Sequence, residues 1–216
     1  MAVSVPTKYY KAMLDTIAYT EGTLGVSQNG YDVLYNYYTI DGWSPDCTFG
    51  HKGNDWLVSA GSYDSTGAGR YAFLSFVWWE NSGKNATELG LTKLTNPLIH
   101  KSNGKEFKYY YNAPFNKANQ DYLGYKLVAK KVSEDELIKG SKSATDFSNM
   151  LAKAKLDCTW TSLARAVPVG TDVKKRCGYK QAEPGKVVNK TVCSPSTCSS
   201  GAEEVYAVFT KALAKY

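Results

Sequence analysis

The fold of this chain is indicated most clearly by residues 14–23, Leu14-Asp15-Thr16-Ile17-Ala18-Tyr19-Thr20-Glu21-Gly22-Thr23. Over residues 9–19 the apolar side chains recur at steps of three and four residues, which is the spacing of a helix with one buried face. Gly22 is well placed to end this helix, because glycine readily adopts the left-handed conformation that closes a helix. The sequence therefore predicts a partly buried helix with Glu21 at its carboxyl end.

This position gives Glu21 a possible chemical role. The negative end of the helix dipole disfavours a carboxylate and favours the protonated acid. Desolvation beside Tyr19 and other aromatic side chains would raise the pKa of Glu21 in the same direction. Cleavage of a glycosidic bond needs such an acid near neutral pH, because the leaving oxygen must receive a proton. A solvated surface glutamate is the competing interpretation, since glutamate is seldom buried without a partner.

The rest of the chain is predicted to be mostly helical, with a small β part near its start. Residues 23–70 are rich in turn-forming residues, and the β-prone pieces 31–34 and 37–40 suggest a small sheet or hairpin. Residues 97–114 are predicted to form a loop or hairpin, and residues 168–200 a long tethered loop. Helices are expected from about residue 73 through Trp78-Trp79 and at 116–130, 133–139, 144–157 and 202–215. Trp78, Trp79 and Trp160 are expected in the core.

Composition limits the class of protein. With 216 residues, 43% of them hydrophobic, the chain is long enough for a real core. No apolar run approaches the roughly 18 residues that span a bilayer. The first 11 residues lack the basic and apolar regions of a signal peptide. We therefore expect no stable membrane insertion and no signal peptide.

Charge is spread unevenly along the chain. Residues 1–100 carry 6 Lys+Arg against 9 Asp+Glu, whereas residues 101–216 carry 20 against 11. A basic half favours an anionic partner, which includes nucleic acid, a membrane surface and a cell-wall polymer. The lysines are scattered, so an ordinary solubilising surface explains them equally well.

Five cysteines are many for a cytosolic protein of this size: Cys47, Cys158, Cys177, Cys193 and Cys198. A short disulfide loop is plausible between the last two, which lie in a turn-rich stretch. The paired Cys-x-x-Cys motifs of zinc ribbons are absent, so we expect no metal site. Disulfides would indicate an oxidising destination, and the odd number leaves at least one thiol unpaired.

Two further segments follow Glu21 in order, Gly30-Tyr31-Asp32-Val33 and Ser65-Thr66-Gly67-Ala68-Gly69-Arg70-Tyr71. Alone, the second is a glycine-rich turn that leads into a helix. Together with residues 14–23, these segments resemble the phage lambda endolysin family. The resemblance is clear over about residues 10–91 and looser over residues 116–163 and in the final helix. Two stretches, at about residues 95–115 and 168–200, look like insertions relative to that family.

The resemblance implies a lysozyme-like α+β fold, with residues 1–216 as a single catalytic domain. It also implies cleavage of peptidoglycan between N-acetylmuramic acid and N-acetylglucosamine by a lytic transglycosylase without a cofactor. The family uses a single glutamate at the position matched by Glu21. In that scheme Glu21 protonates the glycosidic oxygen and then accepts the proton of the muramic acid 6-hydroxyl. That hydroxyl attacks the anomeric carbon and leaves a 1,6-anhydro end.

A two-carboxylate hydrolase would need a second acid at a defined distance from the first. Asp32, Asp41 and Asp64 are the candidates, and each also fits a turn or capping aspartate. Asp32 is the first choice, either for a hydrogen bond to the substrate or for orienting a loop.

The other candidate substrate-binding residues lie in the same loop-rich region: Tyr31, His51, Ser65, Thr66, Arg70 and Tyr71. Tyrosine rings stack on sugars, and hydroxyl groups bond to them. Arg70 either meets a carboxylate of the glycan or forms a structural ion pair with Glu21 or Asp32. His51 either touches the ligand or is solvated. Ala72 stands where the family usually has glutamine, so an amide contact in the cleft is missing or supplied from elsewhere.

Three alternatives stay open: a hydrolytic muramidase, a non-catalytic wall-binding or virion module, and a nucleic-acid binder. The last rests only on the positive second half and would show salt-dependent affinity for DNA. We expect peptidoglycan glycan strands as the partner, no nucleic acid, and a monomer. We also expect synthesis in the cytoplasm of an infected host and action in the periplasm or cell wall, or carriage in a virion.

Overall fold

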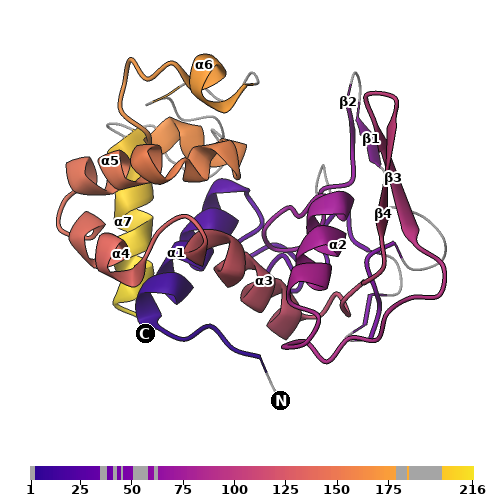
Figure 1. Ribbon diagram of the computed structural model, residues 1–216. Helices are drawn as coiled ribbons and strands as arrows, with labels where there is room; N and C mark the ends of the chain where they lie inside the picture. Colours follow the sequence, from indigo (N-terminus) through magenta and orange to yellow (C-terminus); the bar gives the residue numbers. More distant parts are fainter. Residues whose placement is uncertain are drawn as a thin grey trace. The chain divides into compact units, whose positions relative to one another are not determined.

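The computed structural model describes residues 3–34, 38–40, 43–44, 46–50, 58–60, 63–178, 184 and 201–216 (Figure 1). The chain divides into two compact units. The β-containing unit comprises residues 1–4 and 25–124, and the helical unit comprises residues 5–24 and 125–216. No helix in the described ranges is both long and apolar enough to cross a membrane. The expectation of a single catalytic domain stays a prediction.

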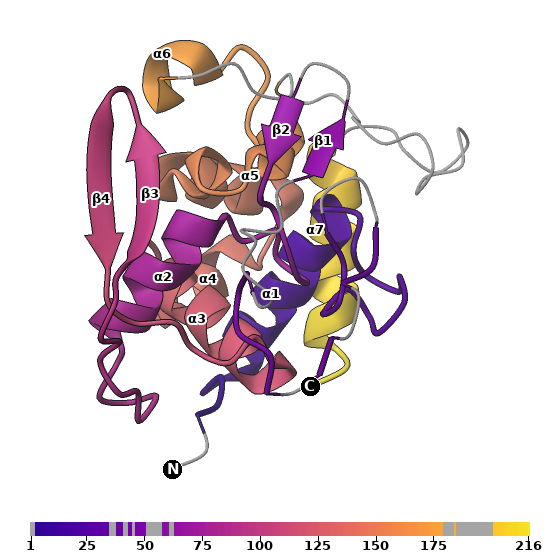
Figure 2. The ribbon, with the colours of Figure 1, turned by 90° about the vertical axis from the view of Figure 1, so that its right-hand side faces the viewer.

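The helical unit is built around α1 and α7, which lie side by side in both views (Figures 1 and 2). Its other helices are short, and η3 and η4 are 3-10 helices. The bounds are α1 Lys8–Thr20, α4 Glu134–Gly140, α5 Ala144–Ala154, η3 Leu156–Cys158, η4 Thr161–Ala166, α6 Val173–Cys177 and α7 Gly201–Leu213. The helices predicted at 9–19, 133–139 and 202–215 are therefore confirmed.

The ends of α4 and α5 follow from local chemistry. Ser133 and Glu136 form a capping box at the start of α4, which satisfies backbone N–H groups that the helix cannot pair internally. The Ser143 side chain accepts a hydrogen bond from the Asp146 N–H at the start of α5. Lys155 adopts the left-handed conformation, with φ of 53°, and ends α5 there. The helix predicted over 144–157 is therefore shorter, and η3 follows it.

The β-containing unit holds α2 and two separate two-stranded antiparallel sheets. The bounds are β1 Val58–Ala60, β2 Tyr63–Ser65, α2 Ser75–Lys84, β3 Leu98–Ser102 and β4 Lys105–Tyr109. Helix α3, Lys117–Ala129, begins in this unit and ends in the other. The hairpin predicted within 97–114 is β3–β4. Its turn residues Asn103 and Gly104 have φ of 50° and 71°, as a two-residue hairpin turn with positive φ requires.

The pieces predicted at 31–34 and 37–40 do pair with each other in antiparallel fashion, as a hairpin would, through the N–H of Leu34 to the carbonyl of Tyr38 and the N–H of Ile40 to that of Asp32, but their described residues form no regular strands. The described part forms isolated bridges, Val33 with Thr39 and Leu34 with Ala68. A physical reason is the turn before them, because Asp32 binds the preceding loop and Gly30 has φ of 88°. The regular pairing lies later, between β1 and β2.

Aromatic side chains fill the core of the β-containing unit. Trp78 and Trp79 are 0% and 1% exposed, and Phe49 and Phe115 pack edge to face against each other at 5.0 Å. The Trp78 indole N–H donates to the carbonyl of Ala113, so its polar atom is also satisfied. The prediction that Trp78, Trp79 and Trp160 are core residues is confirmed. The α+β fold class is likewise confirmed.

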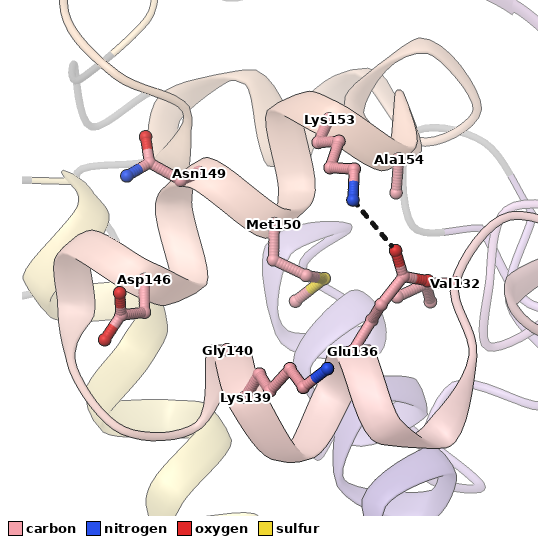
Figure 3. A pocket seen from close by; sticks show the side chains of 9 residues that line it. All are labelled: Val132, Glu136, Lys139, Gly140, Asp146, Asn149, Met150, Lys153 and Ala154. Carbon is pink, nitrogen blue, oxygen red and sulfur yellow. Dashed lines mark hydrogen bonds and ion pairs between the residues drawn. The ribbon is translucent and has the colours of Figure 1, made fainter.

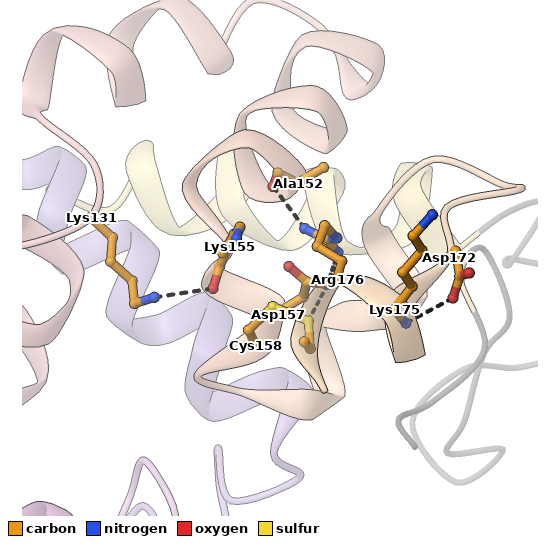
Figure 4. Close-up of a disulfide and its surroundings, with 9 residues drawn as sticks. Lys131, Ala152, Lys155, Asp157, Cys158, Asp172, Lys175 and Arg176 are labelled. Atoms are coloured by element: carbon orange, nitrogen blue, oxygen red, sulfur yellow. Dashed lines mark hydrogen bonds and ion pairs between the residues drawn. A yellow bond between two sulfur atoms is a disulfide. The ribbon is translucent and has the colours of Figure 1, made fainter. Parts of the chain in front are cut away.

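One disulfide among the described residues joins two cysteines whose pairing the sequence did not predict. Cys158 at the end of η3 is bonded to Cys177 at the end of α6 (Figure 4). Cys47 is a buried free thiol among the described cysteines. The loop suggested between Cys193 and Cys198 falls outside the described residues. The short helix α6 was missed within the predicted 168–200 loop.

Candidate active site

Glu21 is the capping residue at the carboxyl end of α1. The N–H of Gly22 donates to the carbonyl of Tyr19, and the N–H of Thr23 donates to that of Ala18, which together form a Schellman motif. Gly22 has φ of 76°, a conformation that glycine adopts without steric cost. The sequence Glu21-Gly22-Thr23 therefore fixes where the glutamate side chain leaves the helix.

Ser162 of η4 is the direct side-chain partner of Glu21. Its hydroxyl lies 2.5 Å from Glu21 Oε1 and 3.0 Å from Thr20 Oγ1. The Thr20 hydroxyl in turn donates to the carbonyl of Ile17. When Glu21 is ionised, Ser162 donates to it. When Glu21 is protonated, the acid can donate to Ser162 while the serine hydroxyl turns toward Thr20. The site can therefore hydrogen-bond both protonation states.

Burial is the largest influence on the Glu21 carboxyl and raises its pKa to about 7. The hydrogen bond from Ser162 and the positive charge of Arg165 both lower the pKa, but by less. The residue as a whole keeps some exposed surface, so the carboxyl is largely desolvated while the side chain stays within reach of a ligand. Desolvation therefore outweighs the other causes, whereas the sequence argument placed the helix dipole first.

Arg165 belongs to a buried ion pair beside this site. Its Nη2 lies 3.3 Å from Glu204 Oε1 of α7. The Tyr19 hydroxyl donates to the same Glu204 oxygen at 2.7 Å. The Arg165 guanidinium lies 5.5 Å from the centre of the Tyr19 ring. Helices α1, η4 and α7 therefore meet at one charged cluster, formed by Tyr19, Arg165 and Glu204. Tyr19 stands two residues before Glu21 in the sequence.

The Ser65–Tyr71 segment belongs to the β-containing unit and has mainly structural bonds. Ser65 Oγ accepts from the Gly67 N–H at 3.1 Å, and Thr66 Oγ1 accepts from the Ser75 N–H at the start of α2. A Cβ added to Gly69 would lie 2.7 Å from the Phe115 ring. Close packing therefore explains the glycine, and helix capping explains Thr66.

Tyr31, Arg70 and Tyr71 gather around Asp121 of α3. The hydroxyls of Tyr31 and Tyr71 donate to Asp121 Oδ1 at 2.8 and 2.5 Å. The Arg70 guanidinium lies over both tyrosine rings and donates to the carbonyl of Asn29. Burial raises the pKa of both tyrosines, so they remain hydrogen-bond donors. Arg70 and Tyr71 are each 2% exposed, which favours the structural role of Arg70.

Gln120 of α3 supplies a buried side-chain amide to this cluster. Its side chain accepts from the Arg70 N–H and donates to the carbonyls of Tyr31 and Phe115. Because Gln120 is completely buried, it braces the cluster. Ala72 has φ of 49°, which is uncommon for a residue with a Cβ.

Asp32 orders the loop before it. Its two carboxylate oxygens accept hydrogen bonds from the Ser27 hydroxyl at 2.7 Å and the Gln28 N–H at 3.1 Å. This geometry fits loop orientation, the second of the two roles considered for it. His51, Asp41 and the side chain of Asp64 lie outside the described residues.

Two cavities of the helical unit lie apart from the Glu21 carboxyl. One, of about 190 Å³, lies between α4 and α5 and is crossed by the Lys153–Glu136 ion pair (Figure 3). The other, of about 470 Å³, lies between α1 and α7 and is lined mainly by apolar atoms, with Lys211 and Lys215 among its residues. Neither includes Glu21 or Ser162 among its lining residues.

Within the described residues, one group of side chains brings three potential metal-ligand atoms together, namely Asp157, Cys158 and Cys177. Its two sulfur atoms are joined in the disulfide, and Asp157 is paired with Arg176 (Figure 4). A disulfide offers no thiolate to a metal ion. This cluster therefore ties α6 to η3.

Sequence reasoning identified Glu21 but missed Ser162, Arg165, Glu204 and Asp121. Ser162 lies within residues 116–163, over which the sequence shows the looser part of the resemblance, so a weak signal was present. Arg165 and Glu204 carried no local signal, because their pairing joins positions far apart in the chain.

Comparisons with known proteins place the fold. No protein-family model matches the sequence, and no curated protein matches it significantly. Bacteriophage lambda lysozyme complexed with a chitohexasaccharide matches with a TM-score of 0.50 and 21% identity, over 96% of this chain and 95% of that one. A second structure, lysozyme from bacteriophage lambda, gives a TM-score of 0.48 and 18% identity with the same coverage. The chain therefore has the fold of bacteriophage lambda lysozyme, as the resemblance in its sequence predicted.

Proposed function

We propose that this chain degrades peptidoglycan as a lytic transglycosylase, with Glu21 acting first as acid and then as base. The observation that carries the proposal is a partly accessible carboxyl whose pKa is raised to about 7 and which hydrogen-bonds Ser162. A general acid works best when its pKa is near the working pH. At that pKa the same group can give up a proton and take one back.

The glycan strand is the substrate class that agrees with this chemistry. The lysozyme that shares this fold was solved with a chitohexasaccharide. In the proposed reaction Glu21 donates its proton to the oxygen between N-acetylmuramic acid and N-acetylglucosamine as that bond breaks. Its carboxylate then accepts the proton of the muramic acid 6-hydroxyl, whose oxygen bonds to the anomeric carbon. The product ends in 1,6-anhydro-muramic acid, and Glu21 is protonated again.

A single carboxylate suffices for this scheme, whereas the two-carboxylate hydrolases need a second. Among the described residues, the groups that act on the Glu21 carboxyl are the Ser162 hydroxyl and the Arg165 guanidinium. Asp32, the first candidate for a second acid, accepts bonds from its own loop. These observations favour transglycosylation over a hydrolytic muramidase, which is the alternative.

Mass spectrometry of the products tests the proposal. Purified cell walls are digested with the parent chain and with Glu21→Gln, and the soluble fragments are weighed. We expect anhydro-muropeptides from the parent and none from the variant. Fragments heavier by one water would indicate the muramidase instead. A parent that binds walls without releasing fragments would indicate a non-catalytic module.

The place of action is part of the same proposal. We expect synthesis in an infected host and action on the wall from the periplasm, or delivery by a virion. The Cys158–Cys177 bond supports an oxidising destination, because disulfides persist in such compartments.

A further inference from the structure

The ion pair between Arg165 and Glu204 is the least expected feature beside the proposed catalytic acid. The side chains of Arg165 and Glu204 are 2% and 5% exposed. Withdrawing two charges from water is costly, and the attraction between them offsets that cost only in good geometry. Within the part of the chain that the structure describes, Arg165 Nε and Nη2 and Glu204 Oε2 have no hydrogen-bond partner. The pair is therefore an inefficient way to stabilise the fold, which favours a role beyond packing.

The location of the pair suggests that role. Arg165 lies one helical turn after Ser162 on η4, the element that holds the Glu21 carboxyl. Its positive charge acts directly on Glu21 and favours the ionised form. An unpaired arginine at this place would act on Glu21 more strongly, because buried charges are poorly screened.

Resting on the proposed function, we propose that Glu204 is a positioning residue for catalysis. It holds and neutralises the Arg165 guanidinium, so that Glu21 keeps its proton at the pH where the wall is cleaved. Glu204 does not touch the substrate. It acts through Arg165, and Tyr19 orients it by donating to the same carboxylate oxygen.

The charged groups on the elements around Glu21 support the role of Glu204 as the partner of Arg165. Helix α1 contributes Tyr19 and Glu21, η4 contributes Arg165, and α7 contributes Glu204. On α4, Glu134 and Glu136 act on Tyr10 at the other end of α1. Asp15 of α1 pairs with Lys215. The group whose charge balances Arg165 next to Glu21 is therefore Glu204.

The test compares Glu204→Gln with Glu203→Gln, its exposed neighbour on α7. Both variants remove one negative charge from the same helix. The pH at which wall cleavage falls to half on the alkaline side is measured for each. In parallel, ¹³C NMR follows the Glu21 carboxyl through its titration, assigned with Glu21→Gln. This second readout does not require activity.

We expect Glu204→Gln to lower the Glu21 midpoint and the alkaline limb together by about one pH unit, the scale of an uncompensated nearby charge. At pH 7 this is a loss of about fivefold in cleavage, because less acid is protonated. Glu203→Gln should shift neither. The double variant Arg165→Met with Glu204→Gln removes both charges and should restore both values, even where Glu204→Gln alone folds poorly.

The outcomes separate the two proposals. An unchanged NMR midpoint in Glu204→Gln, or a double variant that stays shifted, would overturn the role of Glu204. Full wall cleavage by Glu21→Gln would instead overturn the proposed function while the NMR comparison still reported on Glu204.

Discussion

Glu21 and Asp121 are two carboxyl groups that both accept hydrogen bonds from hydroxyl groups, but their surroundings differ. The surroundings of Glu21 suit a catalytic acid, whereas those of Asp121 suit a structural role. Asp121 gathers the hydroxyls of two tyrosines whose rings enclose the buried Arg70. Glu21 receives the hydroxyl of Ser162, is largely desolvated, and has its pKa raised to about 7. The first arrangement fixes a loop against a helix. The second leaves an acid ready to exchange a proton.

The glycine-rich segment, residues 65–71, also has a structural role in the β-containing unit. Substrate binding by Ser65, Thr66, Arg70 and Tyr71 stays a prediction, and the bonds described for this segment are made within the protein. The structure uses Thr66 to cap α2, Gly69 to allow close packing, and Tyr71 to reach Asp121. A segment that builds a scaffold can carry as strong a sequence signature as one that touches a ligand.

The largest effect is expected on the rate of wall cleavage when Glu21 is replaced. Glu21→Gln keeps the shape of the side chain but removes the proton, so wall cleavage should fall by about a thousandfold, the usual scale of general acid catalysis. Release of soluble muropeptides measures the effect. Thermal unfolding should show an intact fold, and a variant that cleaves walls at the parent rate would remove Glu21 from the mechanism.

The Cys158–Cys177 disulfide closes the loop that contains Ser162 and Arg165, and its removal is the second change to test. The Cys158–Cys177 bond closes a loop with a sequence separation of 19, and this loop contains η4 (Figure 4). Replacing both cysteines with alanine should lower the free energy of unfolding by about 3 kcal/mol, as expected for a loop of that size. Denaturant titration measures it.

Reduction of the parent with dithiothreitol should have the same effect on stability, and Cys47→Ala should respond to reduction as the parent does. Equal unfolding midpoints in the oxidised and reduced protein would show that the bond does not hold η4 and α6 in place.

The third prediction concerns removal of the Asp121 carboxylate, which accepts the two tyrosine hydrogen bonds. Asp121→Ala leaves the buried hydroxyls of Tyr31 and Tyr71 without this acceptor, so the free energy of unfolding should fall by about 2 kcal/mol. Asp121→Asn keeps an acceptor oxygen and should cost less. Urea unfolding of both variants checks the order, and an Asp121→Ala chain as stable as the parent would contradict the bracing role.

The smallest effect is expected from removing the hydroxyl of Ser162, which hydrogen-bonds the Glu21 carboxyl. The hydrogen bond from Ser162 lowers the pKa of Glu21, so Ser162→Ala should raise that pKa. Since cleavage needs the protonated acid, the alkaline limb of the pH profile should move to higher pH, with a loss of about tenfold in rate from poorer positioning. Thr159→Ala, on the same segment, is the control. A limb that moved to lower pH would contradict the assigned direction.

Much of the fold could be predicted because it depends on local pattern. The three- and four-residue spacing before Gly22 gave α1, and turn residues bounded the β3–β4 hairpin. Residues 31–34 look like a strand by composition, but side-chain bonds from Asp32 hold the preceding loop in a turn. Composition alone does not reveal such bonds.

The site divides in the same way. Glu21 was found because its neighbours carry a recognisable pattern. Ser162 and Glu204 were not, since hydrogen bonds separated by 141 and 185 positions in the chain leave no periodicity. The leading cause of the raised pKa of Glu21 is burial, which depends on how α1, η4 and α7 pack and not on the helix end alone.

The central claim is that Glu21 is an acid held protonated near neutral pH by its surroundings. Titration of its carboxyl carbon by ¹³C NMR in the parent chain, assigned by comparison with Glu21→Gln, tests this claim most directly. We expect a midpoint near 7 for the Glu21 carboxyl. A midpoint at the ordinary value of 4.5 would show a solvated glutamate and contradict it.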